Sequence, residues 1–161
     1  MTRLPSFDNA GHVLDILVSF HRRLAELYGE MHEVATNPYT LLLLEHMQRR
    51  EQRLTQALQD YEDNASDKII KTWLQMSCPD DPNSFLTSLE TAMLSDTPAN
   101  ATPDDVYALG SKADIYVADL LSYLQDRCEI PEVKAVFADL LAGEKIEHIA
   151  LSKAYNSLRE M

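Results

Sequence analysis

Two residues near the C-terminus have types and spacing that could support metal chemistry. Glu144 and His148 are four positions apart, so an α-helix places both side chains on one face. Carboxylates and imidazoles together are suitable ligands for iron or manganese. His21 and His46 could complete such a site inside the protein. The simpler interpretation, which we favour, is an ordinary acid–histidine pair along one helix, worth roughly 0.2–0.5 kcal/mol.

Three cationic residues suggest a different chemistry. Arg50, Arg53 and Lys145 could together form an internal site for a small anionic ligand such as a carboxylate. Burial of an unpaired cation is strongly unfavourable, so the alternative is that they lie at the rim or pair with acids. The candidate acids are Asp119, Glu51 and Glu144.

Other chemistries find no support in the 161-residue chain. It has 4 glycines, no GxGxxG or GxxxxGK[ST] phosphate-binding pattern and no nucleophile elbow. Its formal net charge of −12 repels nucleic acid and anionic membrane surfaces, so neither is an expected partner. Cys78 and Cys128 form no CxxC motif and are expected to be inert, reduced thiols. The N-terminus lacks the apolar run of a signal peptide, and we expect a cytoplasmic protein.

Four long helices are predicted to position the candidate residues. Asp8 can cap the first, Asn37-Pro38 begins the second, Thr102-Pro103 the third and Ile130-Pro131 the fourth. Each carries apolar residues at spacings of three and four, and the fourth includes Ile149 in this stripe. Between the second and third helices, short helices are expected at residues 69–76 and 85–94.

The arrangement predicts one all-α domain over residues 1–161. A first hairpin covers about residues 8–63, a crossover about 64–102 and a second hairpin about 103–160. The separation from Tyr28 to Arg53 equals that from Tyr123 to His148, which suggests an internal duplication. Two hairpins joined by one long connection indicate a four-helix bundle.

These two hairpins resemble those of the ferritin-like and rubrerythrin-like proteins. The resemblance covers roughly residues 10–63 and 103–158, and rests on the stretches from Leu24-Ala-Glu-Leu-Tyr28 to Leu58 and from Tyr116 to Tyr155. In that family a Glu two turns before a Tyr, followed by Glu-x-x-His on the next helix, occurs in each hairpin. Six side chains then converge on two metal ions in the core.

The resemblance implies which positions here correspond to metal ligands. They are His21, Arg50, Arg53, Tyr116, Lys145 and His148. Among these, only His148 matches the family's residue type. A dinuclear centre needs anionic ligands to offset about four positive charges, so three cations at ligand positions would repel metal. A shifted register would instead offer His148, Glu144, Glu51 and Asp119 as ligands.

The sequence therefore predicts a ferritin-like bundle that is not a functional di-iron enzyme and needs no cofactor. We expect it to act as a binding or interaction protein and to form a homodimer. One alternative is a di-iron or di-manganese carboxylate oxidoreductase, or an iron-handling protein, with rearranged ligands. Another is a carrier that holds a small anionic ligand between its helices.

Overall fold

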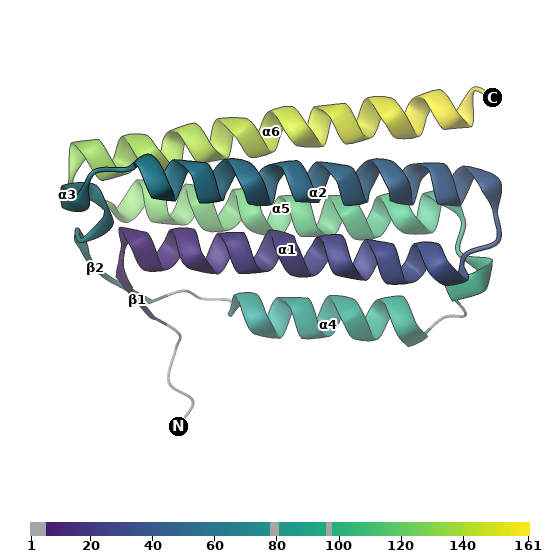
Figure 1. The fold of residues 1–161 in the computed structure, drawn as a ribbon, viewed down its shortest axis with the longest axis horizontal. Helices are drawn as coiled ribbons and strands as arrows, with labels where there is room; N and C mark the ends of the chain where they lie inside the picture. The colour runs from purple at the N-terminus through teal and green to yellow at the C-terminus, as the bar shows by residue number, and fades with distance from the viewer. Residues whose placement is uncertain (1–5, 78–80, 96–97) are drawn as a thin grey trace.

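Four long helices run side by side along the molecule in a computed structural model that describes residues 6–77, 81–95 and 98–161 (Figure 1). They are α1 (Ala10–Val34), α2 (Pro38–Asn64), α5 (Pro103–Arg127) and α6 (Pro131–Arg159). The chain is mostly helical, which confirms the predicted all-α class. In the described part of the chain, no helix is long and apolar enough to cross a membrane.

Short connections make two antiparallel pairs, α1 with α2 and α5 with α6. The predicted starts at Pro38, Pro103 and Pro131 are confirmed. Local chemistry explains them: Asn37 accepts hydrogen bonds from the first backbone amides of α2, and Thr102 forms a capping box with Asp105. The cap of α1 is Asn9, whose side chain accepts from the amide of His12, and not the predicted Asp8.

The connection between α2 and α5 differs in part from the prediction. It contains α3 (Asp67–Ile70), β2 (Trp73–Ser77), α4 (Pro82–Ser95) and the 3₁₀-helix η1 (Pro98–Asn100). The predicted helix at residues 85–94 is confirmed within α4. The predicted helix at residues 69–76 is wrong, because the chain leaves the helical conformation after Ile70. It then pairs in antiparallel fashion with β1 (Ser6–Asn9), a partner far away in sequence.

The apolar stripes of the four long helices meet in one core. Along α1, the apolar residues at spacings of three and four from Val13 to Met31 are all buried: Val13, Leu17, Phe20, Leu24, Tyr28 and Met31. In α6 the buried face carries Phe137, Leu151 and Tyr155, at multiples of about one turn. The predicted core residue Ile149 lies on the other side of this helix and is 55% exposed, so that prediction is wrong.

Helix α4 covers one side of the α1–α5 interface (Figure 1). Phe85 of α4 stacks on Tyr116 of α5 with 4.2 Å between ring centroids, and both rings lie against Phe20 of α1. Tyr116 therefore packs in an aromatic cluster toward α4. Of the two cysteines, Cys128 is buried, and Cys78 lies outside the described residues.

Candidate functional site

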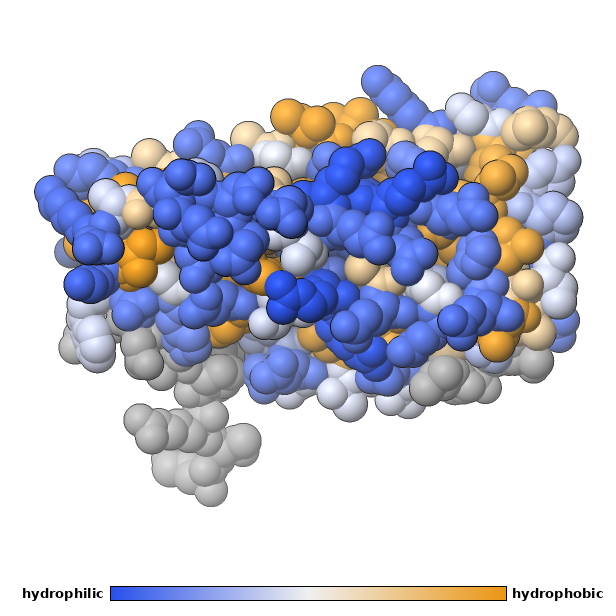
Figure 2. All heavy atoms as spheres, viewed as in Figure 1, coloured by the Kyte–Doolittle hydropathy of each residue, from blue (hydrophilic) through white to orange (hydrophobic). Residues whose placement is uncertain are grey.

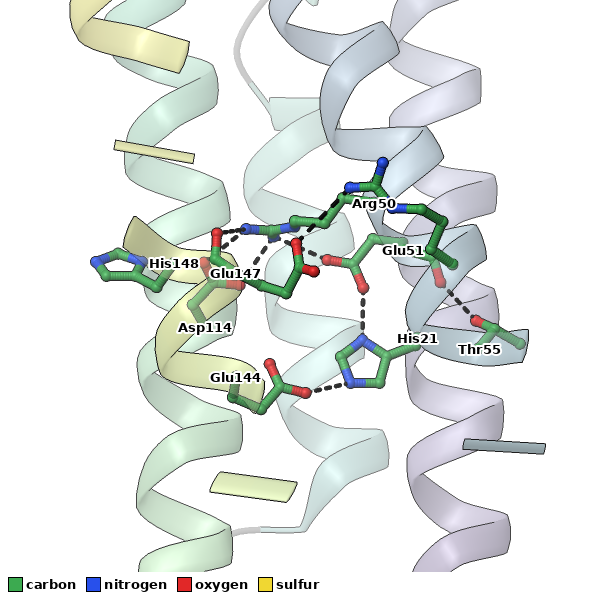
Figure 3. Close-up of polar contacts among 9 residues, drawn as sticks. His21, Arg50, Glu51, Thr55, Asp114, Glu144, Glu147 and His148 are labelled. Carbon is green, nitrogen blue, oxygen red and sulfur yellow. Dashed lines mark hydrogen bonds and ion pairs between the residues drawn. The ribbon is translucent and has the colours of Figure 1, made fainter. Parts of the chain in front are cut away.

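A fully buried arginine lies between the long helices. Arg50 follows Leu43 and Met47 on the inner face of α2, and its side chain has no solvent exposure. Its Nη1 donates to Asp114 Oδ2 at 2.9 Å and its Nη2 to Asp114 Oδ1 at 2.8 Å (Figure 3). This two-point contact joins α2 to α5 with the planar geometry that guanidinium and carboxylate groups share.

A buried histidine extends this contact to the other two long helices. Nδ1 of His21, on α1, lies 2.5 Å from Oε2 of Glu51, whose Oε1 accepts from Arg50 Nη2 at 2.9 Å. Nε2 of His21 lies 2.8 Å from Oε1 of Glu144 on α6. Glu51 thus bridges the two cations, and the resulting set is called the central charge network. Its members are His21, Arg50, Glu51, Asp114 and Glu144 (Figure 3).

His148 contacts this network from its edge. Its Nδ1 lies 3.0 Å from Asp114 Oδ2, and its side chain is 35% exposed. The expected pair between Glu144 and His148 is therefore wrong. On α6, Glu144 points toward His21 of α1, whereas His148 points toward Asp114 of α5 (Figure 3). Sharing one helical face did not bring them together, because each meets a better partner on a neighbouring helix.

The mutual contacts keep His21, Arg50 and Glu51 ionised. Burial alone lowers the pKa of His21, but the charges and hydrogen bonds of Glu51 and Glu144 outweigh it and raise the pKa from 6.5 to about 10. Burial alone raises the pKa of Glu51, but His21 and Arg50 outweigh burial and lower it. The pKa of Arg50 is raised, because Glu51 and Asp114 more than offset its burial. His21 and Arg50 are therefore both cationic at neutral pH.

The surroundings of Asp114 disfavour its charged form. Its burial raises its pKa, with the charge of Glu51 acting in the same direction. Arg50 and His148 lower the pKa but do not compensate fully. Loss of either contact would therefore leave a carboxylate in surroundings that disfavour its charge.

The structure separates the predicted ligand positions into two groups. His21, Arg50, Glu51 and Glu144 lie in the central charge network, with His148 at its edge. The others lie elsewhere: Arg53, Lys145 and Asp119 are exposed, and Tyr116 packs toward α4. Arg53 has a loose contact, 3.8 Å from its Nη2 to Oε2 of Glu147. Arg53 and Lys145 therefore share no internal anion site with Arg50, and the alternative is confirmed: these two lie at the surface, and Arg50 pairs with Glu51.

Sequence reasoning missed Asp114, the acid that holds Arg50. A signal was present, because Asp114 falls on the α5 face marked by Gly110, Ala113 and Val117. A charged residue on an apolar stripe indicates a buried partner of opposite charge. Asp119, which was considered in its place, lies on the exposed side of α5. His46 is half-buried one turn before Arg50, and its burial together with the positive charge of Arg50 lowers its pKa.

The network does not have the composition of a dinuclear metal centre. Over the residues that the structure describes, no three His, Cys, Asp or Glu side chains are placed to hold one ion. The carboxylates point at His21 and Arg50, which already supply two positive charges at this place. A metal ion would have to displace two cations, so the residues present do not fit the group that the family resemblance implies.

A cavity lies elsewhere in the molecule, between α1 and the beginning of α4. It has a volume of about 730 Å³, and its lining includes Asp15, Phe20, Arg23 and Leu86. None of the five network residues lines it. All five network residues are buried, so the central charge network has little contact with solvent.

Replacement of Asp114 by Asn tests whether this network stabilises the fold. We expect Asp114→Asn to lower the free energy of unfolding by about 3–5 kcal/mol, because it leaves Arg50 buried with one partner fewer. Urea unfolding followed by circular dichroism measures the change. The matched control is Asp119→Asn on the exposed side of the same helix, expected to stay within about 0.5 kcal/mol of wild type. Equal effects of the two variants would contradict the assignment.

The raised pKa of His21 predicts how stability depends on pH. The native state keeps a proton on His21 that the unfolded chain releases above pH 6.5. The stabilisation is therefore complete below pH 6.5 and is lost as pH rises toward about 10, with a slope of about 1.4 kcal/mol per pH unit. Urea unfolding between pH 7 and 9 should show a steeper decline for wild type than for His21→Gln.

Titrating groups that do not interact with His21 act equally in the two proteins. One of these groups is Glu62. Burial and a hydrogen bond with Asp15 raise its pKa to about 7, so it titrates near the pH range of the experiment. Its contribution cancels when the two slopes are subtracted. Equal slopes for wild type and His21→Gln would show that His21 does not hold its proton in the native state.

Comparison with known proteins assigns no family to this chain. No protein-family model, no curated protein and no solved structure matches it.

Proposed function

We propose that this protein is a ferritin-like four-helix bundle that works without a metal, as a binding or interaction protein that forms a homodimer. The ferritin-like assignment is supported by the two antiparallel hairpins and the long connection between them. It is also supported by the place where charged residues converge. α1, α2, α5 and α6 each contribute at least one ionisable side chain to a shared centre.

The observation that carries the metal-free role is the position of the two cations. Arg50 and His21 lie among the carboxylates that a metal-binding bundle would turn toward its ions. The alternative with rearranged ligands required His148, Glu144, Glu51 and Asp119 to converge. Asp119 is exposed, Glu51 and Glu144 both contact the cation His21, and His148 contacts Asp114. This geometry favours a structural charge network over an oxidoreductase centre.

Metal analysis of the purified protein tests the proposal. We expect wild type, produced in medium rich in iron and manganese, to carry far less than one metal ion per chain. The physical reason is the repulsion by Arg50 and protonated His21. His148→Ala should leave this low content unchanged. About two ions per chain in wild type, reduced in His148→Ala, would favour the di-iron or di-manganese alternative.

The dimer is proposed to form through the outer face of α6. Ile146 and Ile149 are 66% and 55% exposed, and Ile115 on the adjacent α5 is 55% exposed. Figure 2 shows hydrophobic atoms at the surface over the middle of α6. From Ala142 to Tyr155, a stretch described in full, α6 has no exposed acidic side chain. In a chain with a net charge of −12, two copies meet less repulsion here than at acidic faces.

Charge insertion into this face tests the dimer. We expect wild type to sediment as a dimer, and Ile146→Asp and Ile149→Asp to sediment as monomers, because each adds a desolvated carboxylate to the contact. The matched control is Leu42→Asp, at a 48% exposed position on α2, which should remain dimeric. Sedimentation equilibrium distinguishes these states. A monomeric wild type would refute the homodimer and leave a different protein as the partner.

A further inference from the structure

We infer that a pocket beside η1 binds a straight-chain carboxylic acid, with the carboxylate of the ligand at Lys112 and its alkyl chain between α1, α4 and α5. The inference rests on the proposed binding role and names a ligand class for it. It does not depend on the central charge network or on the dimer face of α6.

The pocket, called here the η1 pocket, is bounded by α1, α4, η1 and the first half of α5. Its volume of about 400 Å³ lies within the usual range for small-ligand sites, roughly 300–1,000 Å³. Two hydroxyl groups fix η1 against the turn between α1 and α2. Thr36 Oγ1 donates to the carbonyl of Ala99, and Thr40 Oγ1 donates to the carbonyl of Ala101, each at 2.8 Å. This wall of the pocket is therefore held in place by the protein itself.

The floor of the η1 pocket is apolar and adaptable. Met31 of α1 and Met93 of α4 are 6% and 4% exposed, and Leu109 of α5 is half-buried beside them. Methionine side chains are unbranched and flexible, so they can fit the outline of an irregular apolar ligand. Ala92 and Ala108 line the outer part of the pocket with short side chains that leave room above the floor. An alkyl chain suits this surface, because it has no polar group that would need a partner there.

Lys112 gives the pocket a cation at its exposed side. The Lys112 side chain lines the pocket and forms no ion pair with any residue that the structure describes. Asp105 also lines the pocket, but its Oδ2 accepts a hydrogen bond from the backbone amide of Thr102 in the cap of α5. The exposed side-chain amide of Asn100 can donate a second hydrogen bond to an anion. A ligand carboxylate would thus supply the partner that Lys112 lacks, and it would stay in contact with water.

An adjacent hollow sets the direction of the alkyl chain. This hollow has a volume of about 300 Å³ and shares Met31, Met93 and Pro98 with the η1 pocket. Its lining also includes the exposed acids Glu30 and Glu33 of α1. Their negative charges would repel a carboxylate, so this end is open to the alkyl chain and closed to the head group. The ligand is therefore oriented with its carboxylate at α5 and its alkyl end toward α1.

Titration calorimetry with hexanoate, octanoate and decanoate tests the ligand class. Each acid is used below the concentration at which it forms micelles. We expect wild type to bind about one molecule per chain. The Kd should fall about fourfold for each added CH₂ group, because each group buries further apolar surface until the pocket is full. Binding without dependence on chain length would contradict an alkyl site.

Lys112→Gln tests the contact with the head group. This variant should weaken binding of octanoate about threefold to fivefold, because it removes one ion pair at the exposed side of the pocket. It should leave binding of 1-octanol unchanged, since this probe has the same chain length and no charge. The matched control is Lys134→Gln, an exposed lysine at the beginning of α6, which should bind octanoate like wild type.

Ala108→Phe tests the position of the alkyl chain. The phenyl ring fills the pocket from an exposed position on α5, so both octanoate and 1-octanol should lose their binding. Ala108→Leu, a smaller replacement, is examined in parallel and should weaken both probes. Ala57→Phe, at an exposed position on α2 away from the η1 pocket, should bind them like wild type. Circular dichroism checks that each variant is folded, as expected for substitutions at exposed positions.

Two results would overturn the inference: no binding of octanoate to folded wild type, or binding that Lys112→Gln and Ala108→Phe both leave unchanged. Either result would leave the metal-free role and the homodimer in place, because metal content and sedimentation test those separately. A monomeric wild type that binds octanoate in the η1 pocket would instead overturn the homodimer and support the inference.

Discussion

The bond between Arg50 and Asp114 is the constraint on which the arrangement of the helices depends. A guanidinium without solvent contact is tolerated only if carboxylates meet it in good geometry. Asp114 fixes the position of α5 against α2. Glu51, which contacts both Arg50 and His21, fixes the position of α1 against α2. Glu144 then ties α6 to α1. A displacement of any one helix along its axis would separate buried charges, whereas apolar contacts alone would tolerate it more easily.

The charge network gives the core a chemical character unlike that of its apolar layers. Residues such as Leu44 and Phe137 stabilise the core by burying apolar surface, and this interaction has no preferred direction. The ion pairs are directional, since each is favourable only when its two groups lie at the right distance and angle. On the proposed assignment, the protein takes this directional order from its own side chains, so its fold does not depend on the supply or the oxidation state of a metal.

Sequence reasoning was accurate where structure is decided locally. Helix starts at Pro38, Pro103 and Pro131 follow from caps and prolines within a few residues. It failed where a distant partner decides. Residues after Ile70 form a strand because β1 is available, and no local pattern contains that information.

The site shows the same division between local and distant information. His21, Arg50, Glu51 and Glu144 could be singled out by type and spacing. The choice between Asp114 and Asp119 required the rotation of α5 about its own axis, because residues a few positions apart on a helix point in different directions. Similarly, the partner of His148 depends on which helix lies beside α6. Those facts arise only when the helices pack.

Contacts within a hairpin and contacts between the two hairpins differ in the sequence separation of the residues that they join. Within α1–α2 and α5–α6, neighbours are closer in sequence, and contacts of this kind favour fast folding. Arg50 and Asp114, like His21 and Glu144, come from different hairpins. These charges give up their water shells only where the two hairpins meet. We therefore expect a misaligned pair of hairpins to leave buried charges unmatched, which is strongly unfavourable.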